Sequence, residues 1–132
     1  MSTVFVSAPD RSANAPAARW KQELDAGRRA LESAYREHGQ PHRLLVAQAR
    51  LTDRVLQGLW AEVDPPPGCA LVAVGGYGRC ELFPHSDVDV VILLPGPLVH
   101  ESASGGASAI ERFISLMWDT GLEIGHSVRT IE

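Results

Sequence analysis

The spacing of apolar residues predicts that two helices form the first ordered part of the chain. From about residue 17, apolar residues recur every three or four positions, as on one face of a helix. These positions are Trp20, Leu24, Gly27, Leu31 and Tyr35. Gly39 followed by Pro41 predicts the end of this helix, and a second stripe predicts another helix over residues 42–63. We therefore expect a helical extension over residues 17–64, preceded by a disordered leader over residues 1–16 that is rich in Ser, Ala and Pro.

After three consecutive prolines at residues 65–67, the pattern changes to that of β-strands. Residues 69–74 are a short apolar run closed by a glycine pair, which predicts a buried strand. Residues 87–94 predict a second strand. Its alternation places Asp87 and Asp89 on one face, opposite the aliphatic side chains of Val88 and Val90.

A loop over residues 95–106 is expected to lead into a third helix and a third strand. Ser108 and Glu111 have the spacing of a capping box at the start of this helix. Residues 122–131 predict the third strand, with Glu123 on the face of Ser127 and Arg129. His126 falls among the apolar side chains, so we interpret it as a hydrogen-bonded core histidine rather than a ligand.

Composition and charge place the chain among single-domain soluble proteins. It has 132 residues, 45% hydrophobic and 21% charged, with a net charge of −4. Residues 65–132 carry three basic and eight acidic side chains, which argues against a nucleic-acid partner. The sequence shows no secretory signal and no apolar run of about 18 residues, so we expect no membrane association and a cytoplasmic location.

The candidate chemistry lies between Gly75 and Asp89. Backbone amides of a glycine-rich turn can approach and bind phosphate groups, because no Cβ intervenes. Asp87 and Asp89, roughly 7 Å apart on one strand face, offer the hard oxygen ligands that Mg²⁺ prefers. The simpler alternatives are that the glycines only make a tight turn and that the aspartates only begin a strand.

Three short motifs in this stretch resemble a known signature. Gly-Gly-Tyr-Gly-Arg (75–79), Glu-Leu-Phe-Pro (81–84) and Ser-Asp-Val-Asp (86–89) resemble the nucleotidyltransferase signature of the DNA polymerase β-like superfamily. Within it, residues 75–94 are similar to the N-terminal domain of bifunctional PII uridylyltransferase/uridylyl-removing enzymes, and residues 116–132 resemble that family's next segment. Cys80 departs from the pattern, because the family usually has glycine there.

The resemblance implies an α/β fold with the mixed sheet of polymerase β-like nucleotidyltransferases, over residues 65–132. It also implies Mg²⁺-dependent transfer of UMP from UTP to a tyrosine of a PII nitrogen-regulatory protein. By resemblance, the magnesium ligands are Asp87 and Asp89, and Gly75, Gly76 and Ser86 contact the triphosphate. Arg79 is either a phosphate contact or a structural residue, and Glu123 is either the third carboxylate or an ordinary surface residue.

Two alternatives to this function remain open on the sequence. One is another polymerase β-like transferase, with ATP as donor or with ligand-sensing domains. The other is an inactive nucleotide-binding fragment, because the family's proteins continue well beyond residue 132 and we interpret the chain as truncated. In that case we expect little transferase activity from the 132 residues alone, and partial exposure of the apolar face that carries Phe113, Met117 and Trp118.

Overall fold

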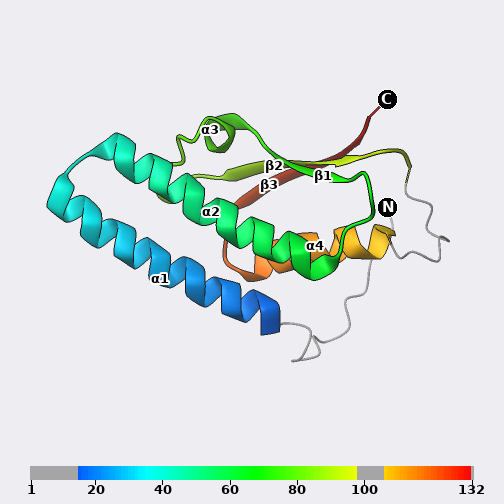
Figure 1. The fold of residues 1–132 in the computed structure, drawn as a ribbon, viewed down its shortest axis with the longest axis horizontal. Coiled ribbons are helices and arrows are strands. Elements are labelled where there is room, and N and C mark those ends of the chain that lie inside the picture. Colours follow the sequence, from blue (N-terminus) through cyan, green and yellow to red (C-terminus); the bar gives the residue numbers. More distant parts are fainter. Residues whose placement is uncertain (1–14, 98–105, 132) are drawn as a thin grey trace.

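The fold is a three-stranded sheet with helices packed on one face (Figure 1). The computed structural model describes residues 15–97 and 106–131. In chain order the elements are α1 (Ala15–His38), α2 (Pro41–Val63), β1 (Ala70–Ala73), α3 (Gly75–Gly78), β2 (Val88–Leu94), α4 (Gly106–Asp119) and β3 (Ile124–Thr130). The predicted α/β class and all three predicted strands are thereby confirmed.

The sheet is mixed, as the resemblance implied. β2 is the central strand; β1 pairs with it antiparallel and β3 pairs with it parallel. The register sets Ala73 opposite Val90, and Asp89 opposite Gly125. The C-terminal end of β1 therefore meets the N-terminal ends of β2 and β3 at one end of the sheet.

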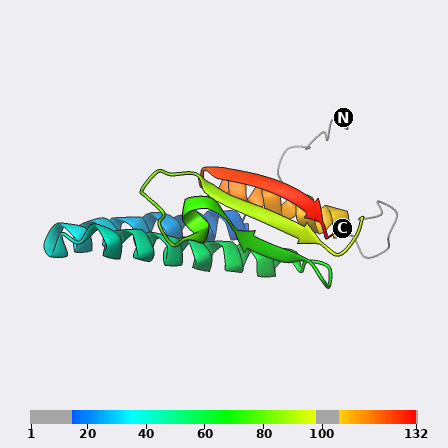
Figure 2. The same cartoon turned by 90° about the horizontal axis from the view of Figure 1, so that it is seen from above.

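One face of the sheet is covered by helices, which form a second layer (Figure 2). Along β2 the buried positions alternate with half-buried ones, and the buried set is Val88, Val90, Ile92 and Leu94. Three side chains from different elements are fully buried where these layers meet: Ile92 of β2, Phe113 of α4 and Leu59 of α2. Asp89 lies on the opposite, half-buried face of β2, as the alternation predicted.

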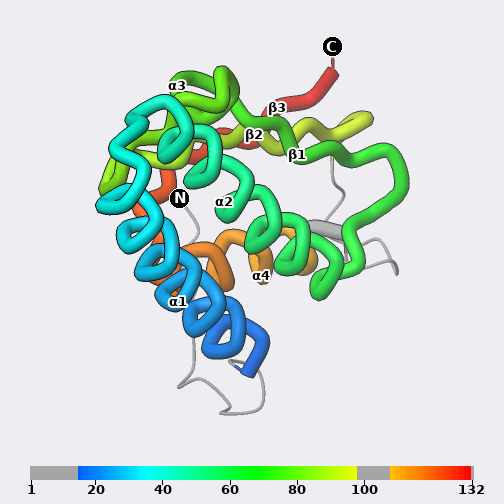
Figure 3. The backbone as a smooth tube through the Cα atoms, turned by 60° about the vertical axis from the view of Figure 1, so that its left-hand side comes forward, coloured from blue at the N-terminus to red at the C-terminus, as the bar shows by residue number. Residues whose placement is uncertain are grey.

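The first two helices form an antiparallel hairpin that shares this core (Figure 3). The turn between them uses Gly39 in the left-handed conformation, with φ of +61°. Gly27 lets the helices approach closely, since a Cβ there would lie 2.6 Å from Leu51 Cδ1. Leu24 of α1 joins the same buried cluster as the sheet and α4, so the helical extension and the sheet share one continuous core.

Two predictions about the C-terminal part are wrong: the capping box at Ser108 and the core position of His126. α4 already begins at Gly106, so Ser108 lies inside the helix and makes no capping box. Phe113 and Met117 are fully buried, because Trp60 of α2 packs edge-to-face on Phe113 with the ring centroids 5.0 Å apart. Trp118 of the same apolar face stays 53% exposed, so the predicted partial exposure of that face is confirmed at this residue.

His126 is exposed rather than a core histidine. Its ring packs edge-to-face with Trp118 at the flank of the sheet, with centroids 6.5 Å apart. Most of the predicted leader and loop (residues 1–14 and 98–105) lies outside the described residues. Within the part that the structure describes, no helix is both long and apolar enough to cross a membrane.

Candidate active site

The Gly-Gly-Tyr-Gly sequence forms a single helical turn directly after β1. Val74 still belongs to the sheet, since its N–H donates to the carbonyl of Asp89 at 3.0 Å. Gly75 then adopts φ of +63°, which is the left-handed region that favours glycine. The N–H of Gly78 returns to the Val74 carbonyl at 3.0 Å and closes the turn, α3. The sequence predicted a glycine-rich turn here, and the structure shows that it is a short helix.

The first backbone N–H groups of this turn have no hydrogen-bond acceptor within the helix. They belong to Gly75, Gly76 and Tyr77. Gly76 also leaves room beside them, because a Cβ there would lie no closer than 3.4 Å to its nearest neighbour, the Glu81 carbonyl. Such a group of amides suits a phosphate oxygen.

The Asp89 carboxylate lies between Gly75, at the start of α3, and Gly125 of the neighbouring strand β3. A Cβ on Gly75 would lie 3.1 Å from Asp89 Oδ2, and a Cβ on Gly125 of β3 would overlap Asp89 Oδ1. Within the described residues, this carboxylate makes no ion pair and no side-chain hydrogen bond. Because both residues are glycines, there is room for the Asp89 carboxylate between them. The carboxylate oxygens have no partner among the described residues and can bind a ligand.

Asp87 and Glu123 lie just before β2 and β3, and both are exposed. The parallel register brings their backbones together, since the Val88 N–H donates to the Glu123 carbonyl at 2.7 Å. Over residues 15–97 and 106–131, however, no group of three or more His, Cys, Asp or Glu side chains is placed to hold a metal ion. The role of Glu123 as a third carboxylate stays a prediction.

Arg79 directly follows the glycine turn, and Ser86 directly precedes Asp87. The Arg79 guanidinium pairs with Glu81 at 3.6 Å, and both side chains are more than half exposed. A surface pair of this kind contributes little to stability, so the guanidinium can leave it for a phosphate. Ser86 is half-buried, and its N–H donates to the Phe83 carbonyl at 3.1 Å within the turn that precedes Asp87.

Tyr77 anchors the glycine turn to the helical hairpin, and the sequence reasoning missed this contact. The ring is 5% exposed, and its hydroxyl donates to the Asp53 carboxylate of α2. Burial, together with the hydrogen bond and charge of Asp53, raises the pKa of Tyr77 well above its usual range. The sequence held no clear signal for it, because the buried face of α2 also carries the polar residues Gln48 and Thr52.

We expect Tyr77→Phe to destabilise the domain by about 1–2 kcal/mol, because Asp53 loses its donor. Denaturant unfolding at pH 7 measures this difference. The raised pKa means that the unfolded state ionises first, so the stability of the parent chain should fall above about pH 10. The variant should show less of this alkaline loss, and equal stability of both proteins at pH 7 would contradict the anchoring role.

Cys80 follows the turn in a left-handed conformation, with φ of +57°. An L-residue with a Cβ pays roughly 1–2 kcal/mol for this conformation, and glycine does not. The positive φ thus gives a physical reason why glycine would suit this position.

The residues present fit a magnesium ion. Asp87 and Asp89 supply carboxylate oxygens, which Mg²⁺ prefers, and it commonly combines one or two carboxylates with phosphate oxygens and water. The Asp89 oxygens have no protein cation beside them among the described residues, and the amides of α3 lie on the same end of the sheet. The two carboxylates would bind one side of the ion, and the triphosphate oxygens would bind the other side.

The mixed α/β fold is consistent with a nucleotidyltransferase, and comparison with known proteins supports the same class. The family model described as "Putative nucleotidyltransferase DUF294" matches residues 26–125, which include the second part of α1, all of α2 and the candidate site. The chain belongs to this nucleotidyltransferase family.

Its curated relatives include the bifunctional uridylyltransferase/uridylyl-removing enzymes of several bacteria. The Bordetella parapertussis enzyme is 46% identical over 112 residues, which are 85% of this chain. The Cupriavidus metallidurans enzyme is 46% identical over 114 residues (86% of this chain), and that of Pseudomonas putida GB-1 is 45% identical over 119 residues (89%). The matched segment is only 12–13% of these relatives' length. No solved structure matches the chain.

Proposed function

We propose that this domain transfers UMP from UTP to a tyrosine of a PII nitrogen-regulatory protein. The observation that carries the proposal is the Asp89 carboxylate held between Gly75 and Gly125, next to the free amides of α3. The similarity to uridylyltransferases over most of the chain supports uridylyl transfer within the nucleotidyltransferase class.

In this proposal the amides of Gly75 and Gly76 bind the triphosphate, with Ser86 and Arg79 on its solvent side. Asp87 and Asp89 hold Mg²⁺, which when bound neutralises phosphate charge and makes pyrophosphate a better leaving group. The half-buried face of β2 positions Asp89, and Tyr77 fixes the amides relative to it through α2. The acceptor hydroxyl attacks the α-phosphate from the solvent side.

A chimeric enzyme tests this function, because the chain corresponds to one segment of its relatives. The matched segment of the Bordetella parapertussis enzyme is replaced by this chain, and the product is incubated with a PII protein, Mg²⁺ and labelled UTP or ATP. We expect UMP on a PII tyrosine, located by mass spectrometry, and none with the Asp89→Asn chimera.

Three other outcomes decide between the alternatives. Transfer of AMP in preference to UMP would identify a different transferase of the same superfamily. A folded chimera that binds UTP with Mg²⁺ but labels no protein would favour a nucleotide-binding module. Labelling by the 132-residue chain alone would show that Glu123, or another residue already present, completes the site.

A further inference from the structure

Phe83 is a large apolar side chain that the fold leaves 59% exposed beside the candidate active site. It lies in the loop between α3, whose first amides lack an acceptor, and β2, which carries Asp89. Single exposed apolar residues are common on protein surfaces, so exposure alone does not indicate a function. The backbone of this loop, however, holds Phe83 in a defined place relative to the site.

Each end of the loop is hydrogen-bonded next to a part of the candidate site. The Glu81 N–H donates to the Gly76 carbonyl at 2.9 Å, which ties the loop to the glycine turn. The Ser86 N–H donates to the Phe83 carbonyl at 3.1 Å, directly before Asp87. Since this second bond closes a four-residue β-turn, the Cα atoms of Phe83 and Ser86 lie within about 7 Å of each other. The backbone of Phe83 is therefore fixed near both the amides and the first carboxylate.

Two residues of the loop have a backbone conformation that a Cβ makes unfavourable. Cys80 has φ of +57° and His85 has φ of +64°. His85 is the third residue of the turn from Phe83 to Ser86, a position at which a type II turn requires a positive φ, and Pro84 precedes it where that turn favours proline. Backbone strain of this kind persists where the surrounding structure imposes it, and it is concentrated at functional sites.

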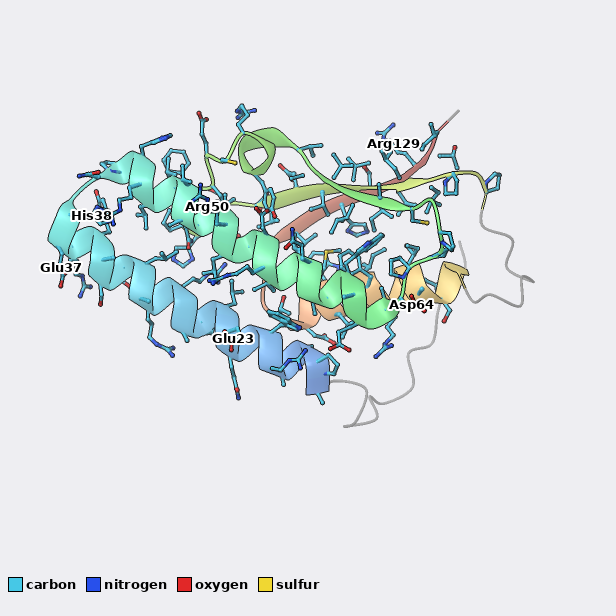
Figure 4. All side chains as sticks on the ribbon, in the orientation of Figure 1. Glu23, Glu37, His38, Arg50, Asp64 and Arg129 are labelled. Atoms are coloured by element: carbon cyan, nitrogen blue, oxygen red, sulfur yellow. The ribbon has the colours of Figure 1, made fainter. Side chains whose placement is uncertain are left out.

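The loop is attached to the hydrophobic core immediately before Phe83. Leu82 is only 4% exposed and belongs to the core cluster that includes residues of α2 and α4. Pro84 and His85 line one cavity together with Gln48 of α2, and Figure 4 labels Arg50 on the same part of that helix. A buried residue before Phe83 and a closed turn after it limit how far the ring can move.

The base of the donor nucleotide is the part that the groups assigned above do not bind. Those groups are amides, a hydroxyl, a guanidinium and carboxylates, which suit phosphate and metal, whereas a base offers a flat π-face. The other Phe, Trp and Tyr side chains of the described residues all lie in helices: Trp20, Tyr35, Trp60, Tyr77, Phe113 and Trp118. Of these, Tyr77 belongs to the glycine turn, but its ring is buried and its hydroxyl is bonded to Asp53. Within the part of the chain that the structure describes, Phe83 is thus the exposed ring in the loop that joins the two halves of the site.

We propose that the ring of Phe83 stacks on the base of the donor nucleotide. The base is covalently joined to the triphosphate, so it is confined near the amides of α3 once they hold the phosphates, and Phe83 binds it at little further entropic cost. Stacking accepts any base, because every base has a π-face. Phe83 therefore strengthens the binding of UTP and of ATP alike. This inference rests on the donor site of the proposed function and adds the residue that binds the base.

Calorimetry of the 132-residue chain with Mg²⁺ tests this contact by comparing UTP with inorganic tripolyphosphate, which has no base. We expect Phe83→Ala to weaken UTP binding by about tenfold, since one stacking contact is lost. Binding of tripolyphosphate should stay unchanged, which a general disturbance of the glycine turn would not allow. Phe83→Tyr keeps the ring and should bind UTP like the parent chain, and ATP should show the same pattern as UTP.

Ile131→Ala is the matched control, because Ile131 is 62% exposed and its N–H donates to Leu94 at the opposite end of β2 from Asp89. It should bind both ligands like the parent chain. Phe83→Ala should unfold at the parent's denaturant midpoint, because the ring it removes is exposed.

The proposal alone is overturned if the parent chain binds UTP and Phe83→Ala binds it equally well, or if Phe83→Ala weakens tripolyphosphate as much as UTP. It is also overturned if Phe83→Ala leaves UTP binding unchanged and raises the KM for the acceptor protein in the chimeric enzyme, since the ring would then contact the acceptor. A parent chain that binds neither UTP nor tripolyphosphate with Mg²⁺ would overturn the donor site itself, and this proposal with it.

Discussion

Replacing Asp89 by asparagine should weaken Mg²⁺-dependent UTP binding by at least about a hundredfold, since a direct metal ligand should matter at least as much as the outer groups that support one. Asp87→Asn should act in the same direction. The physical reason is that an asparagine oxygen lacks the charge that holds a divalent ion against a triphosphate. Isothermal calorimetry with and without Mg²⁺ measures the metal-dependent part directly.

Asp119→Asn provides a matched control, because Asp119 is an exposed carboxylate at the end of α4. It changes the net charge by the same amount without altering the glycine turn. All three variants should keep the parent's thermal unfolding, since Asp87 and Asp89 make no ion pair with a described residue. Equal Mg²⁺-dependent binding by the parent chain and both site variants would remove the metal assignment.

We expect Gly125→Ala to cause the second largest loss of Mg²⁺-dependent UTP affinity. The new Cβ would overlap the Asp89 carboxylate, and Gly125 is fixed opposite Asp89 by the β2–β3 register. The carboxylate must therefore move away from Gly125 and leave the position that it holds between Gly75 and Gly125. We expect a loss of Mg²⁺-dependent UTP affinity of about tenfold or more, because a ligand displaced by about 1 Å no longer meets the ion correctly.

Gly96→Ala is the control for a glycine substitution as such, because a Cβ there meets nothing within 4 Å. It should bind UTP like the parent chain. Unfolding midpoints of both variants distinguish loss of the site from loss of the fold. Normal affinity in a folded Gly125→Ala protein would show that the position of Asp89 is not important for binding.

The helices and strands of this fold were predictable where apolar side chains follow a single clear period along the sequence. The i, i+3, i+4 stripe of α1 and the strict alternation along β2 each have a single physical solution, in which one face is buried. The same alternation placed Asp89 on the face away from the helices. Gly39 likewise marked the end of α1, because only glycine adopts its positive φ without strain.

The contacts that complete the site were not predictable, because they join segments far apart in the sequence. Nothing local indicates that Tyr77 bonds Asp53, 24 residues earlier, or that Gly125 faces Asp89 across the sheet. The sequence also could not distinguish the two adjacent glycines, of which Gly75 has the positive φ. His126 was misassigned since burial of β3 depends on where α4 ends, and beyond Ile124 that strand is mostly exposed.

The most direct test is a crystal structure of the chain with Mn²⁺ and a non-hydrolysable UTP analogue, with data collected at the manganese absorption edge. Mn²⁺ stands in for Mg²⁺, and its anomalous signal locates the ion without reference to the surrounding model. We expect the ion bonded to carboxylate oxygens of Asp87 and Asp89, with the triphosphate against the amides of Gly75 and Gly76. A triphosphate and ion bound elsewhere, with the glycine turn empty, would contradict the assignment of this site.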